Sequence, residues 1–481
     1  MNKTTVLSKI GLTLLGAIGS LGFAPFYLWP IAALSIGAGY YFLRGRGYND
    51  CFWWGAGYAV ANFYWIASPI SANLWYFRIA AILGLFFIVG WLFAAPFMIA
   101  ARANGWRRTL YFAFGWAFML WLREVFMLCP WNPLANIALP FARISGMMAA
   151  AGALGLTFVI AGAIAAIPEY IAGKSKRQFL FLAPLLLFIV FPDIGGGPDS
   201  PSGKSVRIVQ PAFSVFQKSA TAMKGHIKDT LVRLSAGIGN NVDLIVWPET
   251  AYPFGADSTT QFPDLPFGGA LALGAEYRDV TGEYNSLVYI GQGGIAGIYH
   301  KVRLVPFGES RPLGRWIPGG GFKSGGGPVE IGGFAPSVCY EIAWSLSPLA
   351  PGANPEYIVN ITNDAWLEGT PGLPQHLDMA RRQAIETGMP VIFASYAGPS
   401  AIIDNRGAVL RKLPHRERGF LDGEIPPRRT TWYRSIGRDA TMFLIALVCA
   451  AILFAFRPKS RASFVPPRGR SRGIQRGRSG T

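Results

Sequence analysis

The chain has 481 residues, which is too long for one ordinary domain, so we expect at least two parts. Its mean hydropathy of +0.32, with 51% hydrophobic and 14% aromatic residues, excludes an ordinary, wholly soluble protein. The net charge of +18 does not require a nucleic-acid partner, because much of it lies in loops between apolar segments and in the C-terminal tail.

Residues 6–192 are almost continuously apolar. They divide into seven segments, at residues 6–24, 28–43, 51–70, 77–101, 108–128, 144–167 and 178–192. Residues 440–456 form an eighth, uncharged segment, and ~20 apolar residues cross a bilayer. The first segment resembles a signal peptide, because Lys3 and Lys9 precede an apolar stretch. We reject this interpretation because further apolar segments follow directly and the sequence shows no clear cleavage site. The pattern predicts a polytopic membrane protein.

The basic residues of the loops predict how the segments are oriented, because cytoplasmic loops are enriched in Lys and Arg. With the N-terminus inside, the cytoplasmic loops carry Arg44, Arg46, Arg102, Arg107, Arg108, Lys174, Lys176 and Arg177. The opposite loops carry Arg78 and Arg143. Seven crossings of a bacterial inner membrane then place residues 193–438 in the periplasm, and the eighth returns the chain to the cytoplasm.

The C-terminal tail, residues 457–481, contains eight Arg and Lys and no acidic residue. This charge fits a cytoplasmic tail beside anionic lipid headgroups, which attract each basic residue by ~1 kcal/mol. A contact with nucleic acid or with a protein partner is an alternative that the sequence leaves open. Direct nucleic-acid binding is not predicted.

Between the last two apolar segments the sequence changes character. Residues 193–203, "DIGGGPDSPSG", are predicted as a linker because turn-forming residues dominate them. In residues 204–438, β-branched runs alternate with turn signals and helical patterns. The strand candidates are residues 205–213, 241–251, 285–291, 295–309, 335–343, 356–366 and 389–398, and the helix candidates are residues 216–238 and 375–388. Apolar strands with helices between them predict a layered α/β domain, and thus an α+β membrane protein with about eight membrane helices.

Cysteine and histidine usage gives no sign of a metal centre. Cys51, Cys129 and Cys449 lie in or beside apolar segments, where cysteine behaves as a small hydrophobe. Cys339 is alone in the predicted periplasmic domain, so it has no disulfide partner there. The sequence has no Cys-x-x-Cys pattern and its four histidines are scattered. We therefore expect no structural zinc site and no cofactor.

Three candidate strands end in residues that carry chemistry. "LIVWPET" ends near Glu249, "IYHKVRL" contains Lys301 and "PSVCYE" contains Cys339. Ligands of α/β proteins commonly bind outside strand ends, so one site could receive all three side chains. Together they suit acyl transfer: the thiol forms a thioester, the carboxylate moves its proton and the ammonium stabilises an oxyanion. Taken singly, each residue has a plainer reading: a core cysteine, a capping carboxylate and a solvated basic residue.

Four longer stretches make the pattern specific. They are "VWPETAYPF" (246–254), "YHKVRLVPFGESRPLG" (299–314), "SVCYEIAW" (337–344) and "ITNDAWLEGTPGLPQHLDMARRQAIE" (361–386). Together they resemble the nitrilase, or carbon-nitrogen hydrolase, superfamily, and most of all its membrane branch, the apolipoprotein N-acyltransferases. "GFAPFYLWP" (22–30) and "GALGLTF" (152–158) resemble the same branch.

The resemblance implies an αββα sandwich and a catalytic triad. Glu249 would be the general base, Lys301 the residue that stabilises the oxyanion and Cys339 the nucleophile. Glu309 would support the site, and Tyr340 and Glu341 would help to shape the pocket of the nucleophile. The implied reaction moves an acyl chain from a phospholipid to the cysteine, and then to the amine of a lipoprotein.

Two stretches depart from the family pattern. Residues 394–401 read "ASYAGPSA" where the acyltransferases tend to carry Ser-Thr-Asn-Asn-Gly, and residues 211–220 lack the tryptophan of their substrate-facing loop. These stretches lie where substrate choice would be made, so they bear on the acceptor rather than on the triad. One alternative is the plasmid conjugal-transfer TraB group of the same branch, with conjugation machinery as partner and a domain that supports DNA transfer with or without catalysis. A transporter is disfavoured, because the predicted N-terminal helices hold almost no acidic residues beyond Glu124 and Glu169.

Overall fold

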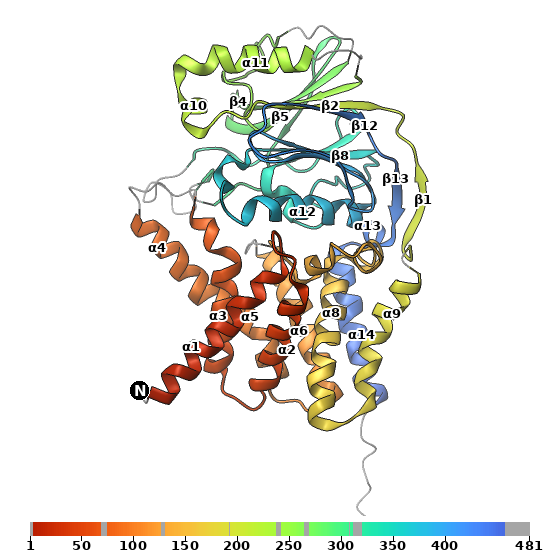
Figure 1. Ribbon diagram of the computed structural model, residues 1–481. Helices are drawn as coiled ribbons and strands as arrows, with labels where there is room; N and C mark the ends of the chain where they lie inside the picture. Colours follow the sequence, from red (N-terminus) through yellow and green to blue (C-terminus); the bar gives the residue numbers. More distant parts are fainter. Residues whose placement is uncertain are drawn as a thin grey trace, which may run out of the picture.

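The computed structural model describes residues 3–68, 75–126, 130–191, 193–236, 242–263, 269–306, 308–310 and 320–456. The helices of the N-terminal part form one block, and a sandwich of two sheets stands on one end of it (Figure 1). Cys129 and the basic tail at residues 457–481 lie outside the described residues. The predicted class, an α+β membrane protein, is confirmed.

Each predicted apolar segment contains a helix. The helices of the block are α1 (Lys3–Ile18), α2 (Trp29–Phe42), α3 (Tyr48–Phe63), α4 (Trp75–Gly84), α5 (Gly90–Ala100), α6 (Trp106–Val125), α7 (Ala142–Ser145), α8 (Met148–Gly173), α9 (Ala183–Val190) and α14 (Arg438–Ala455). A π-helical turn, Leu85–Val89, joins α4 to α5. Among the described helices, Trp75–Ala100, Met148–Gly173 and Arg438–Ala455 are long and apolar enough to cross a membrane. The segment at residues 178–192 forms only the short α9 after a 3₁₀ turn.

Glycines allow the helices of the block to approach closely. A Cβ atom at Gly57 in α3 would overlap the carbonyl oxygen of Thr13 in α1. A Cβ atom at Gly55, also in α3, would overlap the carbonyl oxygen of Gly90 in α5. Close backbone approach gives membrane helices the van der Waals packing that holds them together, because lipid provides no hydrophobic drive between them.

The sandwich contains two main sheets. The six-stranded sheet has the order β12 (Gly419–Glu424), β2 (Ser205–Gln210), β3 (Leu244–Val246), β4 (Ala270–Asp279), β5 (Gly282–Gly291) and β6 (Gly294–His300). The five-stranded sheet has the order β11 (Val409–Leu413), β10 (Ser400–Ile403), β9 (Val391–Ser395), β8 (Tyr357–Thr362) and β7 (Phe334–Val338).

Helices cover the outer face of each sheet. Helix α11 (Lys224–Ala236) packs on the six-stranded sheet, and α12 (Gly372–Thr387) lies between the five-stranded sheet and the helical block (Figure 1). Between the sheets, side chains such as Val246, Val338 and Ile361 form a closed apolar core. The layers are therefore helix, sheet, sheet, helix, as the family resemblance implied.

The structure adds detail to one local prediction and corrects another. Within the predicted linker, residues 193–203, β1 (Gly196–Ser200) pairs antiparallel with β13 (Arg428–Thr431) along one side of the molecule (Figure 1). The helix expected at residues 216–238 is broken into α10 (Val215–Ser219), a 3₁₀ turn and α11. Ser214 ends the preceding loop in a capping box with Gln217, which starts α10 as a separate helix.

Helix α12 is bonded to the helical block along its length. Gln375 donates from Nε2 to the carbonyl oxygen of Ala24 at 3.0 Å. One turn later, the Tyr27 hydroxyl donates to the Asp378 carboxylate at 3.0 Å. Near the other end of α12, Glu386 accepts a 2.8 Å hydrogen bond from the main chain of α8. The sandwich is thus fixed to the block through the helix that underlies the five-stranded sheet.

Candidate functional site

The three strand-end residues singled out in the sequence meet between the two sheets. Glu249 follows β3, Lys301 follows β6 and Cys339 follows β7. The Lys301 ammonium lies 3.4 Å from Glu249 Oε1, and both side chains are buried. The half-buried Cys339 is close enough to both that their charges act on its thiol.

Glu309 completes a buried charge cluster with Lys301 and Glu249. Lys301 Nζ donates to Glu309 Oε1 at 2.9 Å, and Asn285 Nδ2 bridges Glu249 Oε1 and Glu309 Oε1 at 2.7 Å each. Burial alone would lower the pKa of Lys301, but the carboxylates of Glu309 and Glu249 raise this pKa well above its usual value. The lysine therefore stays an ammonium ion, which is the state that can stabilise a developing negative charge.

The second oxygen of Glu249 is held by the opposite sheet. The main-chain N–H of Asn363, which follows β8, donates to Glu249 Oε2 at 2.7 Å. Neither Asn285 nor Asn363 was singled out in the sequence. Asn285 lies inside β5 and reads as an ordinary strand residue. Asn363 and Asp364 directly follow β8, so they carry the same signal as the other strand ends.

Cys339 sits at a strained turn. Its φ angle of +56° lies in the left-handed region, which costs a residue with a Cβ of order 1–3 kcal/mol. The strand β7 ends at Val338 and a 3₁₀ turn begins at Cys339, so the residue lies at the junction between them. Burial, followed by the charge of Glu249, raises the pKa of the thiol well above its usual value, although Lys301 acts in the opposite direction. The resting group is therefore a thiol, and it needs a base to take its proton.

Glu341 is buried, and its hydrogen bonds hold the turn at Cys339. It accepts hydrogen bonds from the main-chain N–H groups of Val302, Arg303 and Val338 at 2.8–2.9 Å. The Tyr299 hydroxyl donates to it at 3.0 Å. Burial raises the pKa of the carboxyl group, while these N–H donors lower it. Glu341 thereby joins the end of β6 to the end of β7 and fixes Lys301 relative to Cys339.

Tyr340 lines the site beneath Lys301. Its ring lies 5.4 Å from the Lys301 ammonium, and its hydroxyl donates to the carbonyl oxygen of Leu304 at 2.7 Å. A cation near an aromatic face is attracted to it, so the ring helps to hold the ammonium in place.

Lys218, at the end of α10, is a second basic group beside the site that the sequence did not reveal. Its ammonium donates to Thr250 Oγ1 at 2.5 Å and lies 4.2 Å from the centre of the Tyr396 ring. Burial lowers the pKa of this lysine to about 8, despite the nearby Glu249 charge. Its position in residues 211–220 places it in a stretch that departs from the family pattern.

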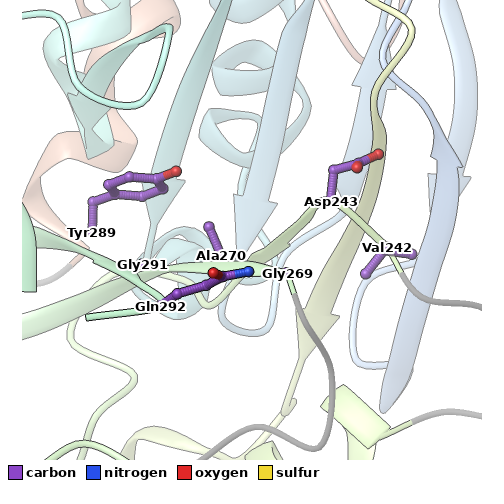
Figure 2. A pocket seen from close by; sticks show the side chains of 7 residues that line it. All are labelled: Val242, Asp243, Gly269, Ala270, Tyr289, Gly291 and Gln292. Atoms are coloured by element: carbon purple, nitrogen blue, oxygen red, sulfur yellow. The ribbon is translucent and has the colours of Figure 1, made fainter. Parts of the chain in front are cut away.

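A cavity of about 430 Å³ lies at the other end of the six-stranded sheet. It is lined by residues that precede β3 and β4 and end β5, among them Asp243, Tyr289 and Gln292 (Figure 2). Glu249 follows β3 at its opposite end, so this cavity is separate from the charge cluster. Within the described ranges, no group of three or more His, Cys, Asp or Glu side chains could hold a metal ion.

Comparisons with known proteins match both parts of the chain. The carbon-nitrogen hydrolase family matches residues 206–435, and the apolipoprotein N-acyltransferase N-terminal domain matches residues 15–166. Apolipoprotein N-acyltransferase of Brucella melitensis is 32% identical over 447 residues, covering 83% of this chain and 84% of the relative. The enzyme of the same name from Sinorhizobium medicae is 31% identical, covering 84% of each chain. That of Rhodopseudomonas palustris is 29% identical, covering 92% of this chain and 94% of the relative.

Proposed function

This chain belongs to the apolipoprotein N-acyltransferase family, and we propose that it carries an acyl group from a membrane phospholipid to the amine of a lipoprotein through a thioester on Cys339. The observation that carries the proposal is the buried cluster of Glu249, Lys301 and Glu309 beside a half-buried cysteine at a strained turn. Strained backbone and clustered charges of this kind are concentrated at active sites.

In the first half-reaction the sulfur of Cys339 attacks the carbonyl carbon of the phospholipid ester. Glu249 takes the thiol proton, since the raised thiol pKa leaves little thiolate at neutral pH. Lys301 stabilises the oxyanion of the tetrahedral intermediate. The C–O bond then breaks, the proton passes from Glu249 to the leaving alkoxide, and a lysophospholipid departs from the acyl-cysteine.

In the second half-reaction the acceptor amine attacks the thioester carbonyl. Glu249 takes a proton from the amine and returns it to the sulfur when the C–S bond breaks. The product is an amide, and the thiol is restored. Glu249 serves both steps without moving, because Asn285 holds one of its oxygens and Asn363 holds the other.

The proposed membrane arrangement rests on the apolar segments and on the basic residues of the loops between them. Residues 1–192 would cross the inner membrane seven times, and residues 193–203 would lead into the catalytic domain at residues 204–438, on the periplasmic side. A last crossing at residues 439–456 would return the basic tail to the cytoplasm. The position of the sandwich on one end of the block supports this arrangement, because every helix of the block lies on the same side of it (Figure 1). An acyl chain could then reach the sulfur without leaving the apolar phase.

The test is a mass measurement on the full-length protein in phospholipid-containing micelles. We expect one acyl group on the peptide that contains Cys339, which neutral hydroxylamine removes because it cleaves thioesters. Cys339→Ala should carry none, and Cys51→Ala, which changes a buried cysteine of α3, should acylate like the wild type. Absence of an adduct on the wild type, when a relative such as the Brucella melitensis enzyme forms one in parallel, would refute the proposal.

The acceptor is tested in a second step. Addition of a diacylated lipopeptide with a free amino terminus should release the acyl group from Cys339 and add the same mass to the peptide. Release to other amines but not to the lipopeptide would point to a different acceptor. The conjugal-transfer alternative predicts loss of plasmid transfer in Cys339→Ala or, for a supporting role without catalysis, transfer that does not depend on Cys339.

A further inference from the structure

A buried histidine contacts the main chain of the proposed nucleophile. His376 lies on α12, is 1% exposed, and its Nε2 is 3.2 Å from the carbonyl oxygen of Cys339. Asn360, on β8, donates from Nδ2 to the same oxygen at 3.0 Å. The oxygen therefore has two side-chain partners from two elements, neither of which is β7.

The hydrogen atoms of this cluster can be placed from its partners. A carbonyl oxygen only accepts, so His376 Nε2 carries a hydrogen atom. The other ring nitrogen, Nδ1, lies 2.7 Å from Asp364 Oδ1, which is hydrogen-bonding distance. Asp364 is itself held by Thr362 Oγ1 at 2.9 Å and by Ser395 Oγ at 3.2 Å. The aspartate thus fixes the ring in the orientation that aims Nε2–H at Cys339.

Aromatic rings fix the plane of the imidazole. Trp131, from the helical block, lies over it with ring centroids 5.1 Å apart and an interplanar angle of 35°. Phe393 of β9 meets it edge-on at 5.2 Å. Trp131 also donates from Nε1 to Gln375, the residue before His376, at 3.2 Å. The histidine is therefore packed between the helical block and the five-stranded sheet.

We propose that His376 is a positioning residue that holds the carbonyl group of Cys339, and with it the left-handed turn that aims the sulfur at Glu249 and Lys301. The inference rests on the proposed function in so far as Cys339 is the nucleophile. Without the His376 donor, Asn360 alone would hold this carbonyl oxygen, and the peptide group after Cys339 could shift out of its strained conformation. The sulfur would then leave the geometry in which Glu249 can take its proton.

Two nearly isosteric variants separate this role from packing. In His376→Gln the side-chain amide nitrogen reaches the place of Nε2 and can still donate to Cys339. In His376→Asn the amide reaches only the place of Nδ1, so it can still meet Asp364 but not Cys339. A misplacement of about 1 Å costs on the order of 10²-fold in rate. We expect thioester formation to slow about 10–100-fold in His376→Asn and to stay within about threefold in His376→Gln, with the KM for phospholipid unchanged in both.

A second readout does not require acyl transfer. The rate at which iodoacetamide alkylates Cys339, followed on its own peptide, should change at least about threefold in His376→Asn and stay close to wild type in His376→Gln. His226→Asn, at an exposed position on α11, is the control and should leave both rates unchanged. Thermal unfolding of each full-length variant shows whether it has folded.

The outcomes are distinct. The positioning role would be overturned if His376→Asn and His376→Gln changed the rates of thioester formation and alkylation equally, or if neither variant changed them. A loss of rate in His376→Gln alone would also overturn it. If the wild type forms no acyl adduct but its alkylation responds to Asn and not to Gln, the positioning role stands and the proposed function fails. If adducts form at the same rate in all variants, the function stands and the positioning role fails.

Discussion

The main-chain N–H of Asn363 donates a 2.7 Å hydrogen bond to Glu249 Oε2, and this bond joins the two sheets of the sandwich. Glu249 belongs to the six-stranded sheet, whereas Asn363 follows β8 of the five-stranded sheet, next to the strand that carries Cys339. The packing of the two sheets therefore fixes the position of the proposed base, Glu249, relative to the proposed nucleophile, Cys339. Contacts of this kind lead to four testable predictions.

The first concerns the acidity of Cys339. Because burial and the Glu249 charge both favour the neutral thiol, its alkylation rate should rise with a midpoint above the value of about 8.5 for a free cysteine. Glu249→Gln removes a negative charge and should shift the midpoint to lower pH. Glu309→Gln should shift it less, because the Glu309 charge acts on the thiol more weakly. A wild-type midpoint at or below that of free cysteine would contradict this account.

The second concerns the stability of the nucleophile turn. Glu341→Gln replaces one acceptor oxygen by an NH₂ group that faces N–H donors, which should cost about 1–3 kcal/mol of unfolding free energy. Denaturant titration measures the loss. Glu356→Gln breaks a surface pair with Lys204 and should change the stability by less than about 1 kcal/mol. Equal stability of the two variants would mean that Glu341 does not hold the turn.

The third concerns Phe216 on α10, whose side chain is 89% exposed in the stretch where the family resemblance expects an aromatic residue that faces substrate. Loss of its apolar surface in Phe216→Ala should raise the KM for phospholipid several-fold and leave kcat and the alkylation of Cys339 unchanged. Val280→Ala changes an equally exposed apolar residue at the turn between β4 and β5 and should alter neither constant. Steady-state kinetics in mixed micelles measures both constants. Equal KM values for phospholipid in Phe216→Ala and Val280→Ala would exclude a contact between Phe216 and the lipid.

The fourth concerns the contact between sandwich and helical block. Tyr27→Phe removes the hydroxyl that donates to the buried Asp378 carboxylate, and a hydrogen bond to a charged group is worth about 1.5–3 kcal/mol. The midpoint of thermal unfolding in detergent should fall. Tyr41→Phe, at an exposed tyrosine of α2, should leave it in place. An unchanged midpoint in Tyr27→Phe would show that this bond adds nothing to the attachment of the sandwich.

The positions of the apolar helices and of seven strands, β2, β3 and β5 to β9, could be read from the sequence, because they depend on local hydrophobicity. The strands β1, β4 and β10 to β13 were not among the candidates. β4 shows why. Its sequence, "ALALGAEYRD", is rich in residues that strands do not prefer, and it is held by pairing with β3 and β5. A Cβ at Gly274 within it would overlap the carbonyl oxygen of Pro248, so the glycine that weakens the pattern is what lets β4 pass close to the Glu249 loop.

The residues of the site likewise divide into those that the sequence could predict and those that it could not. Glu249, Lys301 and Cys339 could be picked out because each is a reactive group where an apolar strand ends. His376 could not, because it lies in an amphipathic helix and reads as a core residue. Its relation to Cys339 depends on how α12 packs beneath β7 and β8, a contact between residues 37 positions apart in the chain.

The attachment of α12 has a consequence for what the sulfur can reach. The same helix is bonded to the block through Gln375, Asp378 and Glu386, and to the carbonyl of Cys339 through His376. Under the proposed membrane arrangement, these contacts would hold the sulfur at a fixed height above the bilayer. The ester groups of a phospholipid lie at the boundary of a hydrocarbon layer ~30 Å thick. Under the proposed chemistry, depth becomes a criterion of selection: ester and amine groups held at the level of the sulfur react, and those held higher or lower do not.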